Sequence, residues 1–201
     1  MTRIVLASGS PRRAELLAAA GFEFEVRQSH LDERVRPGEG ADDYVRRVAT
    51  EKALAIAGQA PGRAVLAADT VVVVDGRVLG KPDDPAEAKQ MLRLLSGRAH
   101  RVLTGVCLVG PAGGERHGPA EAGQYPDTRV AVTEVEFASL TTDEIDWYVA
   151  SGEGVDKAGA YAIQGLASRF VTRIEGSYTN VVGLPVALVY QMCARAGILL
   201  S

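Results

Sequence analysis

The sequence predicts an α/β fold, because segments typical of strands alternate with segments typical of helices along the chain. The run at 64–74 is almost continuously apolar, as expected of a strand that is buried on both faces. Two sequences typical of helix starts, at 84–87 and 141–144, place a glutamate three positions after an Asp or a Thr. Ser10 followed by Pro11 marks a third helix start, directly after a short apolar run.

Glycine and proline separate the elements in the first half of the chain. Gly21 ends the first helix, and Asp75-Gly76 provides a tight turn between two strands. We expect, in order, a strand at 3–7, a helix from 11 to about 20, a strand at 24–27, a loop at 28–40, a helix at 42–57 and a hairpin of 64–74 with 77–79.

The second half continues the alternation around two Gly-rich stretches. The Gly- and Pro-rich segment 110–127 has no periodicity, and we expect a flexible excursion at the end of a long hairpin. Segment 152–178 is also Gly-rich and shows only a short apolar run near 170–171. The expected elements are a helix from 85 to about 95, strands at 101–109 and 130–137, a helix from 142 to about 151 and a last helix at 184–196. We expect a single domain over residues 1–201.

Composition excludes several classes of protein. The chain has 201 residues, with 22 Lys and Arg against 25 Asp and Glu, which gives a net charge of −3. Nucleic-acid binders and polybasic membrane anchors need a positive excess, so we expect neither partner. The first apolar run is too short for a signal peptide or a membrane span, so we expect a cytoplasmic protein. Cys107 and Cys193 are expected to be buried free thiols.

The segment Ser8–Arg13 is the first place where residues contradict their local context. A strand, a Gly/Ser turn and a helix start together aim backbone N–H groups at one point, where an anion can bind. Arg12 and Arg13 lie in the first helical turn, where a cation is disfavoured by about 0.3–1 kcal/mol. A bound phosphate or carboxylate would reverse this cost, and the alternative is a solvated pair of arginines.

Two more charged residues lie where the pattern predicts burial. Lys52 comes four residues after Val48 and four before Ile56, so it points inward with the apolar stripe of its helix. Such a lysine must extend its ammonium to water, pair with an anion or contact a ligand. Asp69 interrupts the apolar run, and a buried carboxylate is costly unless it is paired or binds a metal. We expect a functional role for Asp69, with structural pairing to an arginine as the alternative.

Lys81 and Glu33 complete a set of charges suited to phosphate chemistry. Pro82 holds Lys81 in an extended conformation just past the hairpin, although Lys-Pro pairs are common in loops. Glu33, in the predicted loop, could share a divalent cation with Asp69. Cations together with a metal held by carboxylates are the groups used in phosphoryl transfer, which depends mainly on positioning and charge stabilisation.

With these residues in place, the chain resembles the Maf family of nucleoside triphosphate pyrophosphatases over nearly its whole length. Several independent blocks in the right order carry the resemblance: 6–13 (LASGSPRR), 66–72 (LAADTVV), 79–82 (LGKP), 156–165 (DKAGAYAIQG) and 174–185 (IEGSYTNVVGLP). The resemblance implies a fold like that of the inosine triphosphate pyrophosphatases. We therefore expect a long, mixed, twisted sheet flanked by helices, with two lobes around a cleft.

The resemblance also implies a reaction and its catalytic residues. A nucleoside triphosphate would be hydrolysed between its α- and β-phosphates to a nucleoside monophosphate and pyrophosphate. Asp69 corresponds to the residue assigned as proton acceptor, and Glu33 to one that helps to hold Mg²⁺ or Mn²⁺. The triphosphate would be held by Ser8, Arg13, Lys52 and Lys81. Because a carboxylate bound to a divalent cation is a weaker base, proton acceptor and metal ligand remain alternatives for Asp69.

Substrate choice is implied by three further positions, Arg12, Thr70 and Gln164. The pattern of Lys157 and Gln164 is similar to that of the subclass acting on dTTP and UTP. An amide offers both a donor and an acceptor, so we hypothesise that Gln164 reads the edge of a pyrimidine. The alternatives are the sibling subclass acting on 7-methyl-GTP and a nucleotide-binding regulator of septum formation without significant catalysis. A homodimer is a further expectation from the family.

Overall fold

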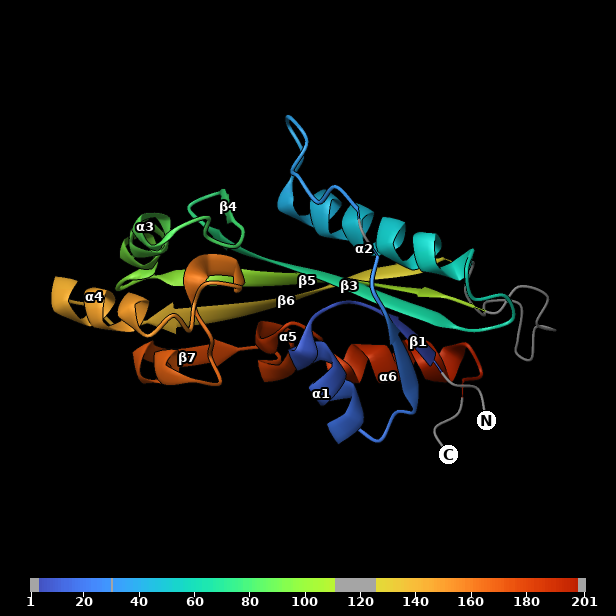
Figure 1. The fold of residues 1–201 in the computed structure, drawn as a ribbon. Coiled ribbons are helices and arrows are strands. Elements are labelled where there is room, and N and C mark those ends of the chain that lie inside the picture. Colours follow the sequence, from blue (N-terminus) through green and yellow to red (C-terminus); the bar gives the residue numbers. More distant parts are fainter. Residues whose placement is uncertain (1–3, 30, 111–125, 199–201) are drawn as a thin grey trace. The chain divides into compact units, whose positions relative to one another are not determined.

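The computed structural model describes residues 4–29, 31–110 and 126–198, and it confirms the predicted α/β class (Figure 1). The described strands form one sheet in the order β2-β1-β3-β5-β6-β7, and β4 pairs with β3. The strands are β1 Ile4–Ala7, β2 Phe24–Arg27, β3 Val65–Val74, β4 Arg77–Leu79, β5 Ala99–Val109, β6 Asp127–Phe137 and β7 Val171–Glu175. The helices are α1 Pro11–Ala19, α2 Ala41–Ala57, α3 Pro85–Leu95, α4 Thr142–Ala150, α5 Tyr178–Val182 and α6 Val186–Arg195, with 3-10 turns at Ala158–Ala160 and Leu166–Phe170.

The sheet is mixed, as predicted. Strand β1 runs parallel to both β2 and β3, whereas β3 with β4 and β6 with β7 are antiparallel pairs. The hairpin of β3 and β4 turns at Asp75 and Gly76, whose φ values are 49° and 75°. Two consecutive left-handed residues are what a tight two-residue hairpin turn requires, and an Asp-Gly pair adopts them at low cost.

The chain divides into two compact units, which agree in number with the two predicted lobes. The first comprises residues 1–69, 104–131 and 183–201, and the second comprises residues 70–103 and 132–182. The first unit is therefore assembled from three separate stretches of the chain, and β3 contributes residues to both units.

In the first unit, β1 is buried on both faces. Successive side chains of a strand point in opposite directions, and those of β1 enter two different apolar clusters. Leu6 packs in one apolar cluster with Leu17 of α1 and Met192 of α6. Its neighbour Val5 packs in a second cluster with Ala53 of α2. Figure 1 shows the corresponding arrangement, with α2 on one face of β1 and with α1 and α6 on the other.

The backbone of α2 approaches β5 closely at one point. A Cβ atom built on Gly105 would lie 2.2 Å from the carbonyl oxygen of Val45, which is far inside van der Waals contact. The close approach therefore requires a glycine at position 105, because any side chain there would push α2 away from β5.

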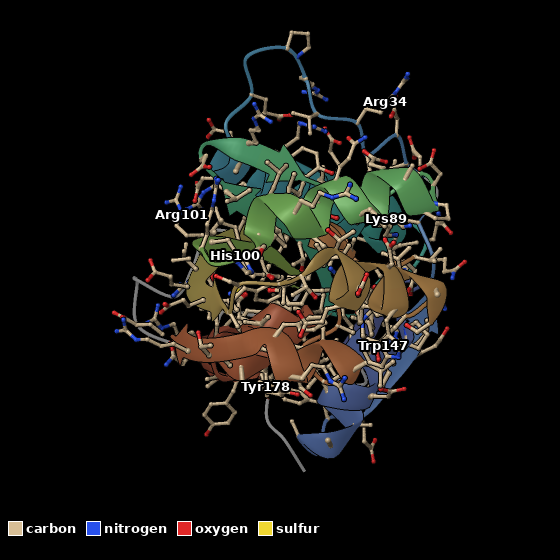
Figure 2. The ribbon with its side chains drawn as sticks, turned by 90° about the vertical axis from the view of Figure 1, so that its left-hand side faces the viewer. Arg34, Lys89, His100, Arg101, Trp147 and Tyr178 are labelled. Carbon is tan, nitrogen blue, oxygen red and sulfur yellow. The ribbon has the colours of Figure 1, made fainter. Side chains whose placement is uncertain are left out.

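The second unit is organised around aromatic side chains. Phe137 at the end of β6, Tyr148 of α4 and Phe170 are each at most 2% exposed, and the Tyr148 and Phe170 rings meet edge to face at 5.5 Å. At the surface, Lys89 of α3 and Asp146 of α4 form an ion pair of 2.8 Å, and Figure 2 shows Lys89 on its helix.

The bounds of most predicted helices and strands are confirmed to within about three residues. The predicted capping residues at the helix starts can be compared one by one with the structure. Thr141 and Glu144 form the expected reciprocal capping box. The predicted box at Asp84 is wrong in one half: Asp84 accepts from the Glu87 backbone N–H at 2.8 Å, but the Glu87 carboxylate accepts from the backbone of Asp83. Ser10 has the backbone conformation of an N-cap residue without a capping hydrogen bond from its side chain.

The sequence prediction missed β7 and the two 3-10 turns in the Gly-rich segment 152–178, and it missed α5, which begins where that segment ends. The expected excursion at 110–127 falls mainly on residues 111–125, which lie outside the described residues, and β6 begins at Asp127. Both cysteines are buried and free, as predicted. Within the described residues, no helix is both long and apolar enough to cross a bilayer.

Candidate active site

The turn between β1 and α1 is held by hydrogen bonds that converge on Ser8. The backbone N–H of Ser10 and Nη1 of Arg13 both donate to Ser8 Oγ at 3.2 Å. Nε of Arg13 donates to the carbonyl oxygen of Gly183 at 2.8 Å. Arg13 is thus tied into the first unit, so the alternative of a solvated arginine pair is wrong for this residue.

The electrostatic surroundings of Arg13 connect it to two carboxylates. Burial lowers the pKa of Arg13, and the negative charges of Asp69 and Glu33 oppose this shift. The positive charge of Arg12 acts in the same direction as burial. Arg12, Glu33 and Asp69 therefore each lie within Coulombic range of the Arg13 guanidinium.

Lys52 joins the two carboxylates. Its ammonium nitrogen lies 2.9 Å from Oδ1 of Asp69 and 2.9 Å from Oε2 of Glu33. The Lys52 and Asp69 side chains are only 8% and 9% exposed, whereas that of Glu33 is 42% exposed. The inward direction predicted for Lys52 is confirmed. The partner of Asp69 is this lysine and not the arginine considered as an alternative.

This arrangement bears on the predicted divalent cation. One ammonium contacts both carboxylates, so Glu33 and Asp69 lie within reach of a single cation. No group of three or more His, Cys, Asp or Glu side chains that could hold a metal gathers among the described residues. Mg²⁺ is usually bound through one or two carboxylates together with substrate phosphates, so the donor set fits a cation that the substrate helps to hold.

The other three predicted site residues, Thr70, Lys81 and Gln164, belong to the second unit. Thr70 follows Asp69 on β3 and is partly buried. Lys81 is exposed and is followed by the buried Pro82. The fixed direction expected of the Lys81 side chain stays a prediction.

Gln164 is exposed on a short turn whose ends are fixed from α4 and the residues that follow it. The backbone N–H of Ala162 donates to the Tyr148 hydroxyl at 3.0 Å. On the other side, the Glu153 carboxylate accepts from the backbone N–H groups of Leu166 at 2.8 Å and Ala167 at 3.3 Å. The amide of Gln164 is thus presented from a backbone that is held both before and after it.

Sequence reasoning missed the residues that support Glu33. The Tyr44 hydroxyl donates to the backbone carbonyl of Glu33 at 2.7 Å, and Arg47 pairs with Glu39 in the same loop. One feature of the sequence pointed to this support. Tyr44 directly precedes the apolar residue Val45 at the start of the helix that also carries Lys52.

Comparisons with known proteins identify the family. The family model described as Maf, Maf-like protein, matches residues 3–196. The chain belongs to the Maf family. A relative from Anaeromyxobacter dehalogenans (strain 2CP-C), named dTTP/UTP pyrophosphatase, is 54% identical over 195 residues, which cover 97% of this chain and 94% of the relative. A protein of the same name from Koribacter versatilis is 48% identical over 196 residues, with coverages of 98% and 95%.

Among solved structures, the Ham1 protein of Staphylococcus aureus has a similar fold. The TM-score is 0.52 at 16% sequence identity, and the match covers 96% of this chain and 98% of that one. At this identity the similarity concerns the fold alone, and it supports the fold predicted for this Maf protein.

Proposed function

We propose that this Maf protein hydrolyses nucleoside triphosphates, with dTTP and UTP as preferred substrates, between the α- and β-phosphates. The observation that carries the proposal is the buried Lys52–Asp69 pair beside Glu33 and Arg13, in a chain whose close relatives are named dTTP/UTP pyrophosphatase. Cations beside carboxylates are the groups that this hydrolysis needs, because negative charge develops on phosphate oxygens as the bridging bond breaks.

The proposed roles follow from charge and position. Arg13 and Lys52 stabilise the phosphate oxygens, and the hydroxyl of Ser8 and the start of α1 supply hydrogen-bond donors. Lys81 corresponds to a further cation that would hold the triphosphate, as the family resemblance implies. Asp69 either accepts the proton of the attacking water or ligates the metal, and the products are a nucleoside monophosphate and pyrophosphate.

Glu33 and Asp69 would hold Mg²⁺ or Mn²⁺ in this proposal. The cation would neutralise charge on the phosphates. The chain's own part would be to keep both carboxylates within reach of one cation, and the contact of the Lys52 ammonium with both of them supports this. Substrate choice is assigned to Gln164, with Arg12 and Thr70 as further contributors.

The test is a pyrophosphate-release assay with dTTP, UTP, CTP, 7-methyl-GTP and modified pyrimidine triphosphates, in the presence of Mg²⁺ or Mn²⁺. We expect Asp69→Asn to lower turnover at least about 10²-fold, as is typical when acid–base catalysis is lost. The matched control is Asp75→Asn, which changes an exposed aspartate at the hairpin turn and should leave turnover near the wild-type value. Near-normal hydrolysis by Asp69→Asn would refute the assignment, and a clear preference for 7-methyl-GTP would refute the substrate class.

Partners and location are part of the same proposal. A net charge of −3 with cations concentrated near one pair of carboxylates suits a free nucleotide better than a nucleic acid. We propose a cytoplasmic homodimer, whose mass can be measured by light scattering. Nucleotide binding without any pyrophosphate release would instead favour the regulator of septum formation.

A further inference from the structure

Glu33 differs from Lys52 and Asp69, its partners in the cluster, because it comes from a loop. Its side chain is 42% exposed, and the segment 31–40 has no regular secondary structure. Holding an exposed loop residue in one place costs conformational entropy, which other contacts must offset. The geometry of the Lys52–Glu33–Asp69 cluster therefore depends on what holds the loop.

Tyr44 holds Glu33 directly. It lies in the first turn of α2, two helical turns before Lys52 on the same helix, and is 7% exposed. Its hydroxyl donates to the backbone carbonyl of Glu33 at 2.7 Å. Burial and the neighbouring carboxylates, among them Asp69, raise the pKa of Tyr44 well above its usual range, so the phenol keeps the proton that it donates.

Arg47 holds the far end of the loop. Nε and Nη2 of Arg47 contact the two carboxylate oxygens of Glu39 at 2.6 and 2.8 Å, and both side chains are largely buried. The same guanidinium donates to the backbone carbonyl of Arg34 at 3.1 Å. Glu39 in turn accepts from the backbone N–H of Arg36 at 2.9 Å. Figure 2 shows the side chain of Arg34 directed outward, and it is 87% exposed, so the loop is held through its backbone at this point.

We propose that Tyr44 is a positioning residue that fixes Glu33 against Lys52, with the Arg47–Glu39 pair as a second point of attachment. One helix then carries both the cation of the cluster and the two side chains that place the loop carboxylate beside it. The inference deepens the proposed hydrolase function and rests on it for its kinetic consequence, although the attachment itself can be measured without activity.

The attachment is tested by hydrogen exchange in the full-length protein. Tyr44→Phe removes one hydroxyl and keeps the buried ring, so we expect faster exchange of the backbone amides in residues 31–40 and little change in thermal stability. Arg47→Lys keeps the charge but loses the two-oxygen contact, so we expect faster exchange mainly near Arg36 and Glu39. The matched control is Tyr161→Phe, which removes a buried hydroxyl bonded to His100 at 2.9 Å and should leave exchange in 31–40 unchanged.

The kinetic consequence is tested by a double-mutant cycle. We expect Tyr44→Phe to lower kcat/KM about 2- to 10-fold, the range for one hydrogen bond, and to raise the concentration of Mn²⁺ that gives half-maximal rate. In a Glu33→Ala background the same change should have almost no further effect, because there is no carboxylate left to place. A merely structural role would give the same factor in both backgrounds, as we expect for Tyr161→Phe.

Each outcome bears on one proposal. Unchanged exchange in residues 31–40 of Tyr44→Phe, or an equal loss of kcat/KM with and without Glu33, would overturn the positioning role. A wild-type protein that releases no pyrophosphate from any nucleotide would overturn the proposed function, and the exchange measurements would still decide whether Tyr44 holds the loop.

Discussion

The pairing of Lys52 with Asp69 allows a quantitative prediction for Lys52→Met. Methionine is similar in length and apolar, so it can follow the path of the lysine stem between the apolar residues of α2. The side chain of Asp69 is only 9% exposed, and the substitution removes the Lys52 ammonium that lies 2.9 Å from its carboxylate. Breaking a buried ion pair by removing one partner costs about 3–5 kcal/mol. Glu33 is half-exposed and can return to water, so its contribution is small.

We therefore expect Lys52→Met to lower the free energy of unfolding by about 3 kcal/mol, near the lower end of that range. For a chain of this size, each kcal/mol shifts Tm by about 2–4 °C, so Tm should fall by about 6–12 °C. The assay is urea denaturation at pH 7 followed by circular dichroism. The double variant Lys52→Met/Asp69→Asn should recover much of the loss, because the buried charge is then gone.

The matched control is Lys89→Met, which removes an ion pair of similar length at the surface. Lys89 and Asp146 lie 2.8 Å apart, but their side chains are 34% and 47% exposed. A pair of this kind contributes about 1 kcal/mol or less. The reasoning is refuted if Lys52→Met costs no more than Lys89→Met, or if the second substitution at Asp69 recovers nothing.

Three further predictions concern other parts of the fold. Burial lowers the pKa of His100 to about 4, whereas a histidine in the unfolded chain titrates near 6.5. As the pH falls, the unfolded chain therefore takes up the proton first. The free energy of unfolding should fall by up to about 3 kcal/mol between pH 6.5 and 4. Gly105→Ala places a Cβ 2.2 Å from the Val45 carbonyl oxygen and should cost about 1–3 kcal/mol, measured by urea denaturation. Glu153→Ala removes the carboxylate that accepts from the backbone N–H groups of Leu166 and Ala167, just after Gln164. The kcat/KM for dTTP divided by that for 7-methyl-GTP should therefore fall.

Each of these has its own control. His100→Phe should remove most of the loss of stability between pH 6.5 and 4, and an unchanged slope would show that other groups cause it. Gly58→Ala, at the other end of α2 in an ordinary helical conformation, should be neutral or slightly stabilising. Glu153→Gln keeps an oxygen acceptor and should preserve more discrimination than Glu153→Ala; equal ratios in both variants would contradict the role given to this side chain.

Local patterns were sufficient to predict the buried charges. Lys52 was recognisable from its place on an apolar helical stripe, and Asp69 from its place in an apolar strand. Both predictions use only the spacing of neighbours in the sequence. The pairing between them could not be predicted in the same way, because it joins residues 17 positions apart on different elements.

The elements that escaped prediction depend on long-range contacts. β7 is an exposed edge strand with charged residues, and it exists because it pairs with β6, as in the register of Ile174 with Val135. The support that Tyr44 gives to Glu33 also escaped, because a tyrosine on an apolar helical face is normally explained by packing alone. Local spacing indicates which residues are buried, but it does not indicate which backbone atom a buried hydroxyl reaches.

The contact of Arg13 with Gly183 has a consequence for synthesis in the cell. The two residues are 170 positions apart, and both belong to the first unit. At about 5–20 residues per second, the ribosome needs roughly 10–30 s to add the acceptor after the arginine has been made. During that interval the turn at Ser8 lacks one of its supports. We therefore expect a nascent chain halted before Gly183 to expose the N-terminal segment to proteases, and the phosphate binding proposed for this segment to develop only late in translation.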